Sequence, residues 1–278
     1  MTTQNRHRIL RNTLIFYIGT MVLSIGGGFI MASGQEAGGL LFVLIPLLMV
    51  LVVRFLLGDG WQNAGLKLHL KKSWRWYVFA LLFTLLVLPV VLVVNTFLGF
   101  AALTMPFSQV LPLLLAGFAI QLVPRTFFGL SEEWGWRGYL EPQLSLLGVP
   151  DTQRHMLVGL LWGLWHFPLI FATDYTTVPL PVFLPLFIVG AIFLAFIYGQ
   201  MRQASGSVWP CVLMHGLGNT LGYAILGVNF IAYNNELLGN IVPGSLIITL
   251  LYALIAMLVT RRHRQVTQLP VGGKTAIS

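Results

Sequence analysis

Two adjacent glutamates, Glu132 and Glu133, lie in the stretch FFGLSEEWGWRGYLEPQL (127–144), and Arg137 follows Glu133 by four residues. Successive residues of a helix point about 100° apart, so the two carboxylates cannot face the same point. A glutamate and an arginine four residues apart often pair on one helix face. We therefore expect Glu133 and Arg137 to form a structural pair, which leaves Glu132 free to face a cavity.

Two histidines and an asparagine add polar groups in apolar surroundings. His166 ends the stretch WGLWH, while His215 and Asn219 are four residues apart and share one helix face. A single His or Asn in such a place often serves helix packing alone. Together with Glu132, however, they suit activation of a water molecule: a glutamate acts as general base, and a His or Asn donates to the oxyanion of a tetrahedral intermediate.

The same residues resemble an incomplete zinc site, because histidine nitrogens and carboxylate oxygens are normal zinc ligands. The sequence contains no H-E-x-x-H motif, so the spacing gives no strong metal signal. The one cysteine, Cys211, shares the helix face of His215. An apolar position disfavours the thiolate, so we expect Cys211 to pack rather than to act as a nucleophile.

The elements that position these residues are predicted to be membrane-spanning helices. Only 9% of the 278 residues are charged, 57% are hydrophobic, and the mean hydropathy is +0.84; soluble domains carry about 25% charged residues. Backbone groups in hydrocarbon must be satisfied internally, and no alternating strand pattern is present. We predict an all-α, polytopic membrane protein with about eight transmembrane helices. The apolar segments are 13–33, 39–57, 76–98, 108–131, 155–173, 180–200, 207–228 and 242–260.

Lysine and arginine are concentrated in alternate connections between these segments, and the other connections carry only Glu36, Asp174 and Glu236 as charges. By the positive-inside rule this pattern places both termini in the cytoplasm, in agreement with an even number of spans. The net charge of +8 is therefore a topology signal and does not indicate nucleic-acid binding. The first apolar run exceeds the 7–15 residues of a signal peptide and more spans follow, so we expect it to be retained.

Depth within the membrane brings three of the polar groups to a similar level. The fourth span is expected to end near Glu141, because the residue before Pro142 avoids helix. At 1.5 Å per residue, Glu132 and His215 lie about 12 Å, and His166 about 18 Å, from the cytoplasmic ends of their spans. This common level favours one shared site in the cytoplasmic half of the bilayer.

No polar segment is long enough to fold alone, so residues 1–278 are expected to form a single membrane domain with a catalytic core at about 108–228. Residues 58–74 mix leucine, lysine and tryptophan, which is typical of an interfacial segment. The basic tail, about 261–278, is predicted to be disordered.

Small residues and one proline are expected to shape the core. Gly159 with Gly163, and Gly218 with Gly222, have spacings that let helix backbones approach closely. Pro168 lies two residues after the first histidine, where it removes a helical donor and predicts a kink.

Three motifs in order, EExxxR at 132–137, WGLWH at 162–166 and HGLGN at 215–219, resemble the CPBP family of intramembrane proteases. That family includes the CAAX prenyl endopeptidases of the Rce1 type and the bacterial Abi proteins linked to bacteriocin self-immunity. Each motif alone is short, but the three in this order are fairly specific. The resemblance covers roughly residues 120–225.

The resemblance implies an intramembrane endopeptidase in which Glu132 and His166 activate the attacking water. It implies that His215 and Asn219 stabilise the oxyanion. The substrate would be a CAAX-like or other membrane-associated peptide or protein. Membrane lipid is the other expected partner, and the expected location is a bacterial plasma membrane.

The resemblance assigns Glu133 and Arg137 a supporting role, in which they hold the first motif in shape. If a metal such as zinc takes part, Glu132, His166 and His215 are the implied ligands.

Two residues depart from the family pattern. Trp162 stands where the family usually has Phe, and Trp136 stands where Phe often precedes the arginine. Both keep an aromatic wall, so we expect the shape of the pocket to differ but not its chemistry.

Two other functions remain open on the residues alone. Buried Glu, His and Arg also mark ion pathways in transporters, although no matched pair of broken helices is present in two halves of the chain. A non-catalytic immunity or scaffold protein could use the same polar cluster to specify helix packing.

Overall fold

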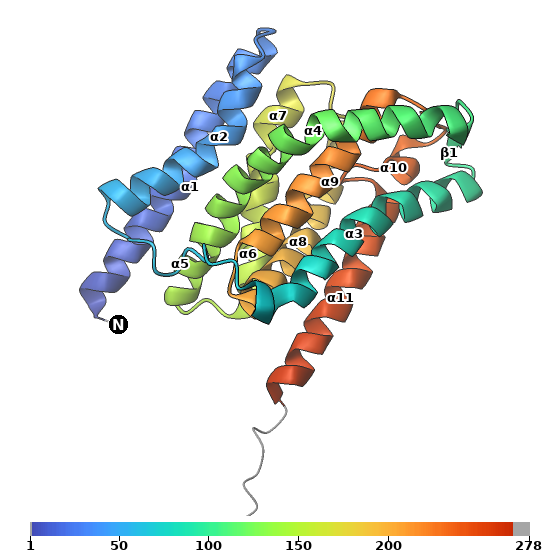
Figure 1. Ribbon diagram of the computed structural model, residues 1–278. Coiled ribbons are helices and arrows are strands. Elements are labelled where there is room, and N and C mark those ends of the chain that lie inside the picture. The colour runs from blue at the N-terminus through green and yellow to red at the C-terminus, as the bar shows by residue number, and fades with distance from the viewer. Residues whose placement is uncertain (1, 269–278) are drawn as a thin grey trace, which may run out of the picture.

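A computed structural model describes residues 2–268 of the chain, with the backbone alone for residues 262–268. Nearly all of the described chain is helical, which confirms the predicted all-α membrane fold (Figure 1). In chain order the elements are α1 (Thr3–Ala32), α2 (Ala37–Leu51), the π-helical turn η1 (Val52–Leu56), α3 (Leu70–Phe97), β1 (Ala101–Leu103), α4 (Phe107–Gly135), the π-helical turn η2 (Trp136–Leu140), α5 (Glu141–Leu146), α6 (Asp151–Trp165), α7 (Phe167–Ala172), α8 (Leu180–Ser205), α9 (Trp209–Val228), β2 (Ile231–Tyr233), α10 (Glu236–Gly239) and α11 (Leu246–Gln268).

Within the described residues, seven helical segments are long and apolar enough to cross a membrane. They correspond to the first seven predicted spans. The eighth predicted span corresponds to α11, whose apolar part, Leu246–Arg261, is shorter. The two short strands, β1 and β2, pair antiparallel and join the connection after α3 to the connection after α9.

Prolines and left-handed residues mark the helix ends. Pro106, Pro150 and Pro179 directly precede α4, α6 and α8, where a residue without an N–H donor costs nothing. Gly206 and Asn229 follow α8 and α9 in the left-handed conformation, with φ of 66° and 52°, and so end those helices.

The prediction that the fourth span ends near Glu141 is wrong. The helix continues from Phe107 through η2 and α5 to Leu146, so Pro142 lies in the first turn of α5. Proline is tolerated there because it follows a widened π-helical turn, at the start of a new helical segment. Figure 1 shows that α4 bends along its length, as expected of a helix that contains Pro112 and Pro124.

Glycines bring neighbouring helices together, but only one of the two predicted pairs does so. A Cβ on Gly159 of α6 would lie 2.5 Å from the Cα of Ile192 on α8, which confirms close approach there. Gly218 and Gly222 of α9 have no atom within 4 Å of such a Cβ, so that prediction is wrong. Both line a cavity instead.

The close approach of α9 to α4 involves a different glycine. A Cβ on Gly216 would lie 2.7 Å from the Cα of Thr126, and one on Gly129 would lie 2.9 Å from the backbone nitrogen of Gly216. Because α4 and α9 run antiparallel and lie side by side (Figure 1), this contact fixes which residues face each other across them.

The two ends of the described chain lie on the same side of the bundle: α1 begins and α11 ends there (Figure 1). The predicted interfacial segment 58–74 is irregular up to His69, and α3 begins at Leu70. Of the predicted tail, 261–268 is the last part of α11, and 269–278 lies outside the described residues.

Candidate functional site

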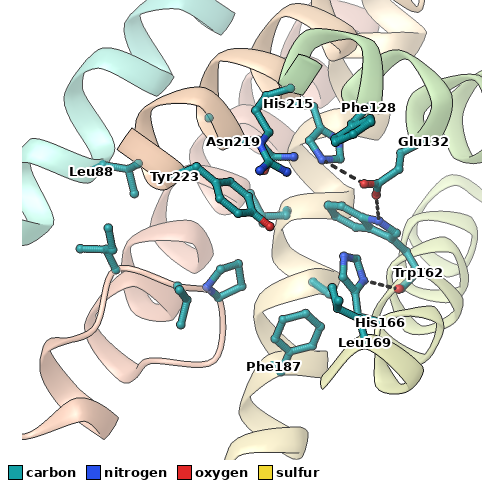
Figure 2. Close-up of a pocket in the computed structure, with 18 of the residues that line it drawn as sticks. Leu88, Phe128, Glu132, Trp162, His166, Leu169, Phe187, His215, Asn219 and Tyr223 are labelled. Carbon is teal, nitrogen blue, oxygen red and sulfur yellow. Dashed lines mark hydrogen bonds and ion pairs between the residues drawn. The ribbon is translucent and has the colours of Figure 1, made fainter. Parts of the chain in front are cut away.

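A cavity of about 500 Å³ opens among the helices and collects the predicted site residues (Figure 2). Glu132 comes from α4, His215 and Asn219 come from α9, and His166 lies between α6 and α7. Residues that are far apart in the sequence thus share one wall, as their common depth predicted.

The carboxylate of Glu132 is held from two sides. The residue is 5% exposed, and the indole Nε1 of Trp162 donates a hydrogen bond of 2.9 Å to its Oε2. Its Oε1 lies 3.6 Å from Nε2 of His215 (Figure 2). A carboxylate buried in this way needs such partners, because its desolvation is otherwise costly.

The ring of His215 lies between the two adjacent glutamates. Its Nδ1 is 2.8 Å from Oε1 of Glu133, and since a carboxylate only accepts, Nδ1 carries the proton. Its Nε2 faces Glu132. The two glutamates thus point in different directions, as helix geometry predicted, yet both contact the same imidazole.

Glu133 and Arg137 form the expected pair, with Nη1 of Arg137 donating to Oε1 of Glu133 at 2.9 Å. Both side chains are fully buried. The guanidinium also lies over two rings, 4.5 Å from the centroid of Trp162 and 4.3 Å from that of Tyr198. A planar cation between aromatic faces is favourably placed.

The backbone around Arg137 is braced by two arginines from other elements, Arg54 and Arg202. Arg54 belongs to η1 and is buried; its Nη2 donates to the carbonyl of Gly138 at 2.6 Å. Arg202, at the end of α8, donates from Nε to the carbonyl of Arg137 at 3.1 Å. Both bonds satisfy carbonyls of η2, the π-helical turn that carries Arg137.

His166 stands at the junction where α6 ends and α7 begins, two residues before Pro168. Its Nδ1 is 2.9 Å from the carbonyl of Trp162. Because a carbonyl only accepts, Nδ1 is the protonated nitrogen, and Nε2 is left with a lone pair. In the described part of the chain, no direct hydrogen bond joins His166 to Glu132.

Asn219 lines the cavity, and its side-chain amide has no hydrogen-bond partner among the described residues. The amide is therefore available to a ligand. Cys211 is buried away from the cavity, where its thiol contacts the carbonyl of Tyr198 at 3.6 Å. This placement agrees with the predicted packing role.

The implied metal ligands do not form a metal site. Across the described residues, no group of three His, Cys, Asp or Glu side chains is placed to hold a metal ion. Nδ1 is engaged in both histidines, by Glu133 in His215 and by the carbonyl of Trp162 in His166, so each ring would offer Nε2 to a metal. Glu132, His166 and His215 are nevertheless not gathered closely enough to hold zinc in this arrangement.

The connection between α7 and α8 completes the cavity wall with Asp174 and Tyr175. Burial raises the pKa of the Tyr175 phenol well above its ordinary value, so that it stays a neutral hydrogen-bond donor. Asp174 is exposed and forms no ion pair with a described residue.

Sequence reasoning missed three features of this site. Trp162 was expected only to form an aromatic wall of the pocket. In the structure its indole donates to Glu132 and its carbonyl accepts from His166. Tyr198, which lies beside Arg137, stands in no motif, so no sequence signal pointed to it. The bracing role of Arg54 and Arg202 was hidden because their partners are distant backbone carbonyls.

Two comparisons with known proteins show what this chain is similar to. Residues 118–221 match the family described as type II CAAX prenyl endopeptidase Rce1-like. The chain is also similar to the CAAX prenyl protease 2 of Methanococcus maripaludis, with 30% identity over 175 residues, 57% of this chain and 61% of the relative. The chain thus spans about three fifths of the length of that relative.

Proposed function

Because residues 118–221 of this chain match the Rce1-like family, we propose that the protein is an intramembrane endopeptidase that cleaves with an activated water. One observation carries the proposal: Glu132, His166, His215 and Asn219, from separate helices, line one cavity inside an apolar helical bundle.

In the proposed reaction, Glu132 is the general base. Its Oε2 is engaged by the indole of Trp162, so Oε1 is the oxygen that accepts the proton of the water. The free Nε2 of His166 accepts a second hydrogen bond from that water. This bond orients a lone pair of the water oxygen toward the carbonyl carbon of the substrate. The water oxygen forms the new C–O bond while its proton moves to Glu132.

The tetrahedral intermediate places a negative charge on the former carbonyl oxygen. The side-chain amide of Asn219 has no protein partner among the described residues and donates to that oxyanion, a contribution of about 3–4 kcal/mol for one well-placed donor. His215 adds a second donor from Nε2 when both ring nitrogens carry protons, since Nδ1 already faces Glu133. The C–N bond then breaks as Glu132 returns its proton to the leaving amine.

Glu133 and Arg137 take no direct part in this scheme and act as positioning residues. Glu133 holds the imidazole of His215 through Nδ1, and Arg137 balances the charge of that buried carboxylate. No step passes through a metal, because the donor set does not fit one.

The comparisons support a substrate class for the proposed reaction. The relative is named a CAAX prenyl protease, and the family shares that description. We propose a membrane-associated peptide or protein, CAAX-like at its C-terminus, as the substrate. We also propose a plasma-membrane location with both termini in the cytoplasm, as the basic connections predict.

The test uses the purified full chain in detergent micelles and an internally quenched peptide with an S-farnesyl cysteine, two aliphatic residues and a free C-terminus. Glu132→Ala and His166→Ala should abolish cleavage while the melting temperature stays close to that of the normal protein. Full activity in either variant would overturn the proposal. Solute uptake into proteoliposomes without any hydrolysis would favour a transporter instead.

A further inference from the structure

A second charged side chain, Arg125, lines the cavity on the same helix as Glu132. Arg125 precedes Glu132 by seven residues, two helical turns, so the two side chains lie on the same face of α4. No step of the proposed hydrolysis uses it.

The contacts of Arg125 leave most of its hydrogen-bond donors free. Its Nε donates to Oε1 of Gln121 at 2.9 Å, and its guanidinium carbon lies 3.4 Å from the ring centroid of Tyr223 and 5.4 Å from that of Phe128. Within the described residues, Nη1 and Nη2 have no acceptor and Arg125 has no ion pair. Aromatic stacking holds the plane of the group, and the outer N–H groups remain available.

Other arginines in the helices are satisfied differently. Arg137 pairs with Glu133, Arg154 pairs with Asp151, and Arg202 donates to backbone carbonyls. A cation within an apolar span is costly unless it has a partner or faces water. Arg125 faces the cavity, and neither acid of the cavity wall, Glu132 or Asp174, forms an ion pair with it.

The helices α4 and α9 form one wall of the cavity, and because they run antiparallel, their residues face each other in pairs along it. Glu132 lies opposite His215, and two turns along α4 the guanidinium of Arg125 lies on the ring of Tyr223. The helical rise from Glu132 to Arg125 is about 10 Å. An extended peptide advances about 3.3 Å per residue, so this rise matches about three residues of bound substrate.

We propose that Arg125 binds a carboxylate of the substrate, and that this carboxylate is the free C-terminus lying about three residues beyond the cleaved bond. The planar fork of a guanidinium suits bidentate binding of a carboxylate, which a point charge does not reproduce. This inference rests on the proposed endopeptidase function and adds to it a subsite that fixes where the chain is cut.

The experiment compares two quenched peptides that are identical except that one ends in a carboxylate and the other in an amide. The normal protein should cleave the acid with kcat/KM about 10- to 100-fold above the amide, the range expected for a charge-assisted bond. Arg125→Met should reduce this ratio to about 1, and Arg125→Lys should leave an intermediate ratio. Arg75→Met, which removes an exposed arginine that stacks on Trp74 outside the cavity, should keep the normal ratio.

Binding provides an independent readout in the Glu132→Gln background, where no turnover is expected. Fluorescence anisotropy of the two labelled peptides should show tighter binding of the acid, and Arg125→Met should remove the difference. A third peptide, amidated but with glutamate as its last residue, separates a C-terminal carboxylate from a side-chain one: its tight binding would overturn the assignment to the C-terminus.

Two results would overturn the inference: equal binding of acid and amide by the Arg125-containing protein, or an acid preference that survives Arg125→Met. Failure of the proposed function has a different signature, since neither peptide would then be cleaved although the binding difference persists. The two ideas can therefore fail separately.

Discussion

The indole of Trp162 donates a hydrogen bond to the carboxylate of Glu132, 2.9 Å from Nε1 to Oε2, within the buried wall of the cavity. The backbone carbonyl of the same residue accepts the bond from Nδ1 of His166. One tryptophan thus orients both groups that are proposed to handle the water. A phenylalanine at this position would keep the aromatic wall and the carbonyl but lose the donor.

Trp162→Phe therefore isolates the contribution of that hydrogen bond. A hydrogen bond to a charged group contributes about 1.5–3 kcal/mol, so kcat should fall about 10- to 100-fold with little change in KM. Trp209→Phe is the matched control, because its indole donates to the carbonyl of Leu66 outside the cavity. The test is to measure kcat of both variants in steady-state cleavage. Equal kcat values for Trp162→Phe and Trp209→Phe would contradict the proposed role of the Trp162 indole.

Gly216→Ala should separate the two helices that carry the site. The added methyl would lie 2.7 Å from the Cα of Thr126, and backbone on α4 cannot yield as a flexible side chain would. A displacement of about 1 Å can cost about 100-fold in rate, so kcat/KM should fall by roughly that factor. Gly227→Ala, also on α9 but with no atom within 4 Å of its Cβ, should behave as the normal protein. Normal activity in Gly216→Ala would show that α4 and α9 can move apart without harm.

Arg137→Met should destabilise the fold, because it leaves the Glu133 carboxylate buried without its cation. Breaking a buried pair from one side costs about 3–5 kcal/mol. Thermal unfolding in detergent, followed by tryptophan fluorescence, should show a clearly lower melting temperature for Arg137→Met. The double variant Glu133→Gln/Arg137→Met should show a smaller decrease. If the single and the combined variants melt at the same temperature, the pair does not carry the stability assigned to it.

Chelation offers a test of the water-activation scheme without substitutions. The described side chains provide no three-ligand metal site, so EDTA or 1,10-phenanthroline should leave the cleavage rate unchanged after overnight incubation. Glu132→Gln should lose activity under the same conditions. Loss of activity with chelator and its recovery on adding Zn²⁺ would mean that Glu132, His166 and His215 rearrange around a metal.

Much of the fold could be predicted from sequence, since apolar length and proline position act locally. The prediction of a polytopic helical protein is confirmed, and seven predicted spans match long apolar helices in the described residues. The end of the fourth span could not be predicted, because Pro142 normally signals a helix end and the π-helical turn before it leaves no local sequence mark. Gly216 was missed for a related reason: its contact with Thr126 depends on how α9 lies against α4.

In the site, too, contacts between residues close in sequence could be predicted, whereas contacts between distant residues could not. Helix geometry predicted that Glu133 pairs with Arg137, and the structure has that ion pair. The contact of Glu133 with His215 joins residues 82 positions apart, and the indole bond of Trp162 to Glu132 joins residues 30 apart. Such contacts depend on tertiary packing, which residue spacing does not encode. The roles of these residues in catalysis stay predictions until the variants are measured.

The π-helical turn at Trp136–Leu140 sets the rotational phase of everything after it. Beyond this turn Glu141 faces inward, 3.2 Å from Nδ1 of His155. Removing one residue from the turn would restore ordinary winding but swing α5 by about 100° around its axis. The Glu141 carboxylate would then move away from His155. The extra residue in this turn therefore keeps Glu132 and Glu141, nine positions apart, both directed into the protein.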